Sequence, residues 1–247
     1  MNEGEPRSAV RWAAVIGGIL IAAAIIALYT PWVRIFDLRK IVVKGNYYTS
    51  TSQVEASCGI RNGVNLLRAP LKQARASLLQ LPWIMNASLR RILPHTLEIT
   101  VRERTPIALV IDSTDSSRMM VLGKDGVIVG YARDASAQFV HVSGVSVESG
   151  PSGKISVNGD VTRTLIYLRK QGLGRDLFPR IDFSNSSAVT MYTVDGGKVV
   201  LGPSSDIEER IDELKALLRT IDLADYQMID LRFGGEARLV PRKVVNR

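Results

Sequence analysis

The sequence predicts an α+β protein: a single N-terminal transmembrane helix, a small β-α-α-β-β domain, and a mixed β-sheet domain with covering helices. Three observations support this prediction. Residues 12–33 carry no charged side chain, short helices and period-two strands alternate over 34–104, and further strands with two amphipathic helices follow over 105–241. A hydrophobic content of 46% in 247 residues is enough for folded cores. The predicted segments are a tail 1–11, a membrane helix 12–33, domains 34–104 and 105–241, and a basic tail 242–247.

The charge-free segment is long enough to cross a bilayer. A helix over 12–33 would measure about 33 Å against a hydrocarbon core of about 30 Å. Trp12 stands at one end, and Tyr29 and Trp32 stand at the other, where interfacial aromatic residues belong. A buried core helix and a cleaved signal peptide are the alternatives. We favour an uncleaved anchor, because Leu28-Tyr29 places bulky residues where a cleavage site needs small ones.

Charge leaves the orientation of this helix open. Arg7 and Arg11 precede it, whereas Arg34, Arg39, Lys40 and Lys44 follow it, so a simple positive-inside count would put the C-terminus in the cytoplasm. That rule is weak for long domains, which cross the membrane largely regardless of their charge.

The basic character of the chain is local. The formal charge is +8, from 32 Lys+Arg and 24 Asp+Glu, and residues 34–104 hold 12 of these bases but only 4 of the acids. This domain lacks interleaved basic and aromatic residues and any nucleic-acid motif, so we expect no nucleic-acid partner. The excess of Lys and Arg instead favours contact with anionic membrane lipid.

Turn and cap residues divide the first domain into elements. Gly45-Asn46 predicts a turn after the first strand. Ser50, Thr51 and Ser52 are candidate N-caps of a short helix through Cys58, which Gly59 ends, and Pro70 and Pro82 bound a second helix. The strands are predicted over 36–43, 87–91 and 96–103.

The second domain reads as strands with two helices. Asp160 is the expected cap of a helix over 161–171, and Ser205-x-x-Glu208 predicts a capping box before a helix that reaches Ile221. Residues 132–158 are rich in Ser, Gly and Pro and are expected to form a surface loop. Strands are predicted in a hairpin over 120–129 and over 179–183, 188–194, 198–201, 228–233 and 237–240, with Pro241 ending the pairing.

Residues for catalysis or metal binding are scarce. No phosphate-binding loop and no Gly-x-Ser-x-Gly motif occurs. Cys58 is the single cysteine and reads as a small buried residue, while His95 and His141 each stand alone. We therefore expect a protein that is not an enzyme and that needs no cofactor or metal.

Two separated motifs resemble a known family. Ile41-x-Val43-x-Gly45-Asn46 resembles the opening strand of a POTRA domain. The segment 81–108, from Leu-Pro-Trp-Ile to Glu-Arg-x-Pro-x-Ala, is similar to the signature of the FtsQ/DivIB cell-division family. Ile229 to Phe233, Ile-Asp-Leu-Arg-Phe, resembles the end of that family's β-domain, although Phe139 to Gly144 departs from its usual Leu-Pro segment.

This resemblance implies a single-pass type II protein of the inner membrane, with most of the chain periplasmic or otherwise outside the cytoplasm, concentrated at the division septum. It implies a scaffold of the divisome that links early membrane division proteins to late septal peptidoglycan-synthesis components. The POTRA domain would contact other divisome membrane proteins, and the C-terminal sheet edge would bind coiled-coil proteins of the FtsB/FtsL type by strand addition. The residues that map to this edge are Phe233, Ala237, Leu239 and Val240.

Alternatives remain at this level. The four edge residues could simply complete the domain's own sheet. The chain could also be a membrane-tethered basic binding protein that faces the cytoplasm, or a secreted hydrolase, although the hydrolase lacks a catalytic constellation.

Overall fold

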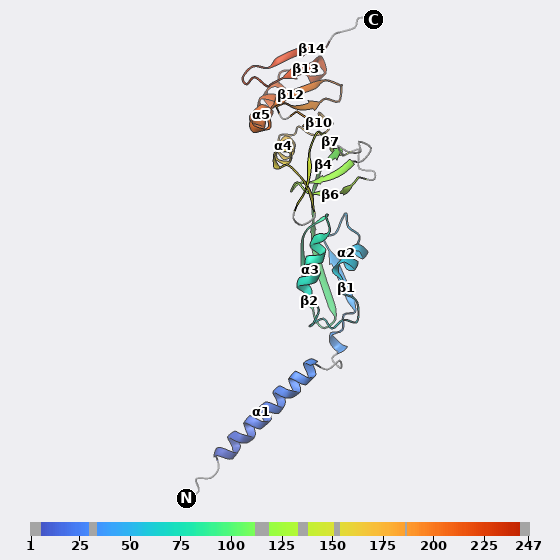
Figure 1. The fold of residues 1–247 in the computed structure, drawn as a ribbon, viewed down its shortest axis with the longest axis vertical. Coiled ribbons are helices and arrows are strands. Elements are labelled where there is room, and N and C mark those ends of the chain that lie inside the picture. Colours follow the sequence, from blue (N-terminus) through green and yellow to red (C-terminus); the bar gives the residue numbers. More distant parts are fainter. Residues whose placement is uncertain are drawn as a thin grey trace. The chain divides into compact units, whose positions relative to one another are not determined.

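The computed structural model describes residues 6–29, 34–111, 119–132, 138–150, 154–185 and 187–242 (Figure 1). The chain forms two compact units that do not follow a single cut along the sequence. Unit 1 comprises Met1–Leu79 and Asn86–Arg102, and unit 2 comprises Gln80–Met85 and Glu103–Arg247.

Helix α1 spans Pro6–Tyr29. Several of its apolar side chains are exposed, among them Leu20 at 64% and Ile26 at 61%. Over the described residues, no helix combines the length and the apolarity that crossing a membrane requires. The membrane span over 12–33 therefore stays a prediction, and positions 30–33 lie outside the described residues.

The rest of unit 1 has the predicted β-α-α-β-β order. Strand β1 pairs in parallel with β3, which is the central strand of the order β1-β3-β2. Of the three candidate caps, Ser50 is the N-cap of α2, and its side chain accepts a hydrogen bond from the backbone of Gln53. Gly59 ends α2 in a left-handed conformation, as predicted. The elements are η1 (Arg34–Phe36), β1 (Lys40–Lys44), α2 (Thr51–Cys58), α3 (Leu71–Gln80), β2 (Ile84–Ile92) and β3 (Thr96–Glu103).

The first strand starts later than predicted. Residues 36–39 were expected in it, but η1 occupies Arg34–Phe36 and β1 begins at Lys40. The backbone of Leu38 pairs instead with a loop, donating to the Val64 carbonyl at 2.9 Å and accepting from Gly63 at 2.8 Å. The alternation of residues was therefore a correct sign of extended backbone, but the hydrogen bonds of this segment go to a loop.

Unit 2 contains a sheet of nine strands in the order β14-β13-β12-β11-β10-β7-β4-β5-β6. Its pairs β4/β7, β7/β10 and β12/β13 are parallel, and a separate hairpin of β8 and β9 lies beside it. The strands are β4 (Pro106–Ile111), β5 (Met119–Gly123), β6 (Ile128–Tyr131), β7 (Val140–Ser143), β8 (Val147–Ser149), β9 (Ile155–Val157), β10 (Arg180–Asp182), β11 (Val189–Tyr192), β12 (Lys198–Gly202), β13 (Tyr226–Asp230) and β14 (Arg238–Pro241).

Two central strands differ from the prediction. Strand β4 was not expected, and β7 lies inside the segment 132–158 that was predicted to be a surface loop. Both strands lie in the interior of the sheet, where Leu109, Val110 and Val142 are completely buried. Strand β4 is buried on both faces, and its run Pro-Ile-Ala-Leu-Val-Ile therefore lacks the alternation of apolar and polar residues that marks a strand in a sequence.

Helices α4 (Gly159–Lys170) and α5 (Ile207–Leu217) pack on the main core of unit 2, on the sheet face that carries Met191, Val199 and Ile229 (Figure 1). Two expected caps are wrong. Asn158, not Asp160, caps α4 by accepting a hydrogen bond from the Asp160 backbone. No capping box forms at α5, because Ser204–Asp206 is a 3-10 turn (η3) and the N-cap position falls on Asp206 without a side-chain bond. A second 3-10 turn, η4 (Leu223–Asp225), precedes β13.

The buried side chain of Arg104 holds residues 80–85 within unit 2. Its Nε donates to Asp125 Oδ2 at 2.7 Å, and its Nη1 donates to the carbonyl oxygens of Pro82 and, at 2.7 Å, Ile84. The Arg104 backbone donates to the Trp83 carbonyl at 2.8 Å. One guanidinium therefore satisfies two carbonyl groups and a carboxylate, which explains why this segment packs with unit 2.

Candidate partner-binding edge

Strand β14 forms one end of the nine-stranded sheet. It pairs with β13 in the antiparallel register Met228↔Val240, Ile229↔Leu239 and Asp230↔Arg238, and within the described residues it pairs with no other strand. One side of β14 therefore presents backbone N–H and C=O groups that no other strand in the described part of the chain uses. The strand also extends one residue further than predicted, because Pro241 stands opposite Tyr226 instead of lying beyond the paired residues.

The four residues predicted for this edge lie on β14 and the connection before it, but they point in different directions. Phe233 is 70% exposed on the connection, and Ala237 is exposed just before the strand. Leu239 is partly buried and packs against the main core, as its partner Ile229 does. Val240 is partly buried and follows Leu239 by one residue, so it lies on the opposite face. The exposed apolar contact available to another chain is therefore mainly Phe233.

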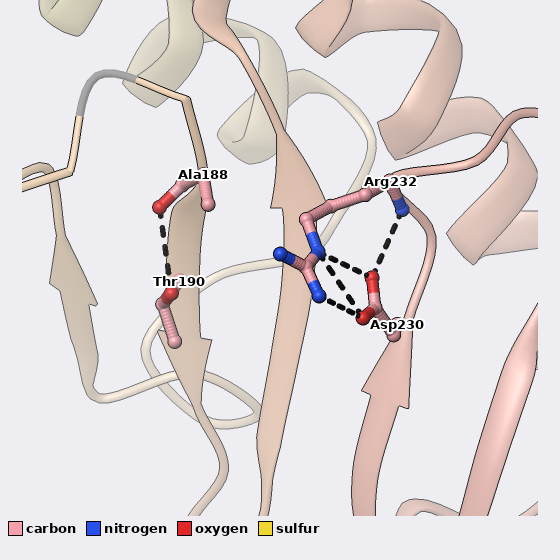
Figure 2. Close-up of polar contacts among 4 residues, drawn as sticks. All are labelled: Ala188, Thr190, Asp230 and Arg232. Atoms are coloured by element: carbon pink, nitrogen blue, oxygen red, sulfur yellow. Dashed lines mark hydrogen bonds and ion pairs between the residues drawn. The ribbon is translucent and has the colours of Figure 1, made fainter.

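A buried acid and a half-exposed base fix the start of the connection (Figure 2). Arg232 Nε donates to both oxygens of Asp230, at 2.9 and 3.1 Å, and its Nη2 donates to Oδ2 at 2.6 Å. The Arg232 backbone also donates to Oδ1 at 3.1 Å. The Asp230 carboxylate thus accepts from both the side chain and the backbone N–H of Arg232, two residues further along the chain. These bonds hold the turn by which the chain leaves β13.

We call the Asp230–Arg232 ion pair the clamp. The electrostatics of the clamp follow from the unequal burial of its two side chains. The Asp230 side chain is 3% exposed and the Arg232 side chain is 45% exposed. Hydrogen bonds from the Arg232 side chain lower the pKa of Asp230 below its ordinary value, although burial of the carboxyl opposes this shift. The same hydrogen bonds raise the pKa of Arg232. Asp230 is therefore held as a carboxylate, and its charge is compensated locally.

Helix α5 holds the other half of the connection. Arg210 Nη1 donates to both oxygens of Glu213, at 2.8 and 2.9 Å, and Glu213 Oε1 accepts from the Gly235 backbone at 3.3 Å. Gly234 has a φ of +55°, and a Cβ at this position would lie 2.8 Å from Arg210 Nη2. Both its backbone angle and its closeness to Arg210 therefore favour glycine at 234.

The clamp and the helix together display an aromatic ring. The Arg232 guanidinium carbon lies 5.4 Å from the centre of the Phe233 ring, a cation–π contact at the surface. On the other side, a Cβ placed on Gly202 would lie 3.6 Å from the Arg232 Cα, so Arg232 packs closely on the end of β12. Sequence reasoning placed Phe233 here but missed Asp230, Arg232, Arg210 and Glu213. The Asp-x-Arg spacing at the end of a strand could have indicated the clamp, because an Asp side chain often accepts from the backbone two residues further on in a turn.

Other reactive groups do not assemble into a site in the described part of the chain. No group of three or more His, Cys, Asp or Glu side chains there is arranged to hold a metal ion. Cys58 is buried, as predicted, and that burial raises the pKa of its thiol. His95 lies in the turn before β3, where its carbonyl accepts from the Arg39 backbone at 2.9 Å, and His141 lies in β7.

Comparison with known proteins identifies the first domain and extends across the chain. Residues 36–104 match the family model of the FtsQ-type POTRA domain. The chain is 27% identical over 208 residues to cell division protein FtsQ of Agrobacterium fabrum, an alignment that covers 80% of this chain and 59% of the relative.

Two further relatives are matched over most of their length. Cell division protein DivIB of Clostridium acetobutylicum is 22% identical over 81% of each chain. Cell division protein FtsQ of Geotalea daltonii is 23% identical over 94% of this chain and 87% of its own length. The POTRA match lies in the first domain, and the three alignments span 80%, 81% and 94% of the chain. The chain therefore resembles the FtsQ/DivIB cell division proteins over most of its length, and its first domain matches their POTRA domain.

Proposed function

We propose that this protein is a non-enzymatic scaffold of the divisome that links early membrane division proteins to late components of septal peptidoglycan synthesis. The observation that carries this proposal is β14, an edge strand of a large sheet beside an exposed aromatic side chain, Phe233. A second chain can add a strand to such an edge, where backbone hydrogen bonds supply affinity and side-chain contacts supply specificity.

In this proposal the partner is a coiled-coil division protein of the FtsB/FtsL type. Its added strand would lie along β14, beside Ala237, Leu239 and Val240, and an apolar partner side chain would cover Phe233. Leu239 already packs inward, so its contribution would be to hold β14 in place. Phe233 would supply most of the side-chain contact, because it has the largest exposed apolar surface among the four.

The rest of the chain would place this edge at the membrane. Residues 12–33 would form the anchor of a single-pass type II inner-membrane protein, with a short cytoplasmic tail over 1–11 and most of the chain outside the cytoplasm at the septum. The exposed apolar side chains of α1 support an anchor, because in water they would be costly to leave uncovered. Unit 1 would contact other membrane proteins of the divisome.

Replacing Phe233 by Glu tests the edge. Covering a Phe side chain contributes about 1.5–3 kcal/mol, so Phe233→Glu should weaken binding of the coiled-coil partner by about tenfold or more and reduce its recruitment to the septum. Tyr131→Glu is the matched control, since Tyr131 is 58% exposed on β6, the opposite terminal strand of the same sheet. Normal partner binding and septal recruitment with Phe233→Glu would refute the assignment.

Reporter fusions at the C-terminus separate the scaffold from a cytoplasm-facing basic binding protein. Alkaline phosphatase fused there should be active, because that enzyme needs an oxidising compartment for its disulfides. A second fusion carries a fluorescent protein at the same C-terminus. An inactive phosphatase fusion together with cytoplasmic fluorescence of the second fusion would instead support the basic binding protein.

A further inference from the structure

Three segments meet at the end of unit 1 that follows the proposed membrane anchor. The backbones of Arg39 and Lys40 donate to the His95 carbonyl at 2.9 and 3.3 Å, and the backbone of Leu38 donates to the Val64 carbonyl at 2.9 Å. Residues 34–40, the loop at 61–64 and the β2–β3 turn at 92–95 therefore form one end of the three-stranded sheet. We call this end the basic tip.

Apolar side chains of the basic tip are exposed without cover from unit 1. Ile35 is 61% exposed, Leu93 is 54% exposed and Ile92 is 40% exposed. Ile35 belongs to η1, whereas Ile92 and Leu93 belong to the end of β2 and its turn. Exposed apolar residues that gather from separate segments mark a surface that meets another phase or another molecule.

Basic side chains surround these apolar residues. Arg34, Arg39, Lys40 and Arg61 are exposed, and within the described residues none of them takes part in an ion pair. Two other basic residues of unit 1 have internal roles. Lys44 pairs with Glu98, and the Arg91 guanidinium donates to the Leu66 and Ala69 carbonyls. The basic tip therefore carries these four exposed bases and one acid, Asp37, which gives it a formal net charge of +3.

We infer that the basic tip docks on the surface of a bilayer that contains anionic lipid. This inference rests on the proposed anchor at 12–33, which would leave Arg34 at the membrane interface. Arg39 lies six residues beyond position 33, so it could be at most about 20 Å from the end of the anchor. Apolar side chains that enter the headgroup region and cations that meet lipid phosphates are the two signals that together hold a protein surface on a membrane.

Each cation near an anionic membrane favours the docked state by about fivefold, so reversing three of them should disfavour it by about a hundredfold or more. The apolar residues alone would dock on zwitterionic lipid as well. Dependence on lipid charge and on salt therefore distinguishes this contact from simple apolar insertion, because 1 M salt shortens the screening length to about 3 Å.

The test uses the full chain in lipid nanodiscs, with Cys58→Ala to leave a single labelling site. A spin label at Leu93→Cys reports the basic tip, and a label at Leu20→Cys in a second sample reports the anchor. The label at 93 should be shielded from a water-soluble relaxation agent in nanodiscs with anionic phosphatidylglycerol, and accessible in pure phosphatidylcholine or at 1 M salt. The label at 20 should be shielded in all of them.

Charge reversal completes the test. Arg39→Glu, Lys40→Glu and Arg61→Glu together should make the label at 93 accessible in anionic nanodiscs. The matched control reverses Lys124, Arg169 and Lys198, three exposed basic residues of unit 2, and should leave it shielded. Lipid docking is overturned if the label at 93 is equally accessible in both lipids. It is also overturned if the label stays shielded after the charge reversal. Shielding that requires added protein overturns it as well and indicates a protein partner. An accessible label at 20 would instead refute the anchor.

Discussion

Removing the charge of Asp230 should weaken unit 2 in a way that depends on pH. Asp230→Asn keeps the size of the side chain and an oxygen for the Arg232 backbone, but it replaces charge-assisted bonds from the guanidinium with neutral ones. Breaking a fully buried ion pair costs about 3–5 kcal/mol. The Arg232 side chain is 45% exposed and can be hydrated once released, so we expect a smaller loss of about 1–2 kcal/mol in the free energy of unfolding at pH 7.

The pH dependence follows from the direction of the pKa shift. The pKa of Asp230 is lower in the folded chain than in the unfolded chain, because Arg232 donates to the carboxylate. The ionised carboxylate therefore stabilises the fold fully above its unfolded pKa of about 3.9. That contribution falls as the pH drops below about 4 and through the lower, folded pKa. Asparagine does not titrate, so the stability difference between the two proteins should shrink at low pH.

Urea unfolding at pH 7 and pH 3, followed by the fluorescence of Trp83 in unit 2, would measure this difference. Trp12→Phe and Trp32→Phe in both proteins would leave Trp83 as the only tryptophan. Glu236→Gln is the control, because Glu236 is an exposed acid on the same connection and its neutralisation should change stability by less than about 0.5 kcal/mol. An equal loss for Asp230→Asn at both pH values, or no loss at pH 7, would show that the clamp does not stabilise the fold through charge.

Two further changes test neighbouring features. Gly234→Ala should lower the free energy of unfolding by about 1–2 kcal/mol, because alanine is strained at a φ of +55° and its Cβ would press on Arg210. Thermal unfolding would measure this loss. Gly174→Ala is the control, because a Cβ there meets open space and φ is not positive. A gain in stability would contradict this account of the turn. Ser50→Ala should cost unit 1 about 1 kcal/mol through loss of the α2 cap, whereas the exposed Ser77→Ala on α3 should be close to neutral in urea unfolding. Equal losses for the two serine variants would rule out a capping effect.

Local signals in the sequence predicted the elements whose stability is set locally. Ser50 and Gly59 bound α2, and the turn Lys124-Asp125-Gly126 joins β5 to β6, because caps and tight turns depend on only a few adjacent residues. Strands β4 and β7 were missed because both depend on distant partners. Residues Val140 to Ser143 of β7 do alternate, but this pattern is only four residues long within a segment predicted as a loop, and its hydrogen bonds come from β4 and β10, which flank it.

The same distinction applies to the candidate site. The position of the edge could be predicted, because Gly234-Gly235 separates the predicted strands 228–233 and 237–240, which together form a hairpin. The support behind it could not, since Arg210 and Glu213 lie on a helix about twenty residues earlier and meet the connection only in the folded protein. Leu239 was predicted as partner surface from its place on the last strand, but its inward packing depends on the register with Ile229.

The two terminal strands of the nine-stranded sheet differ in a way that favours β14 as the binding edge. Beside β6, Val127 forms a bridge with Ser156, and the Val157 backbone donates to the Gly126 carbonyl at 2.9 Å, so the hairpin of β8 and β9 partly covers that edge. No comparable hairpin lies on β14 in the described part of the chain. An uncovered edge strand is a hazard, because it can pair with unintended chains. The clamp and the hydrogen bond from the Gly235 backbone to Glu213 of α5 restrain the connection before β14. This restraint lowers the entropy lost on binding, so β14 can receive a partner strand without first being ordered.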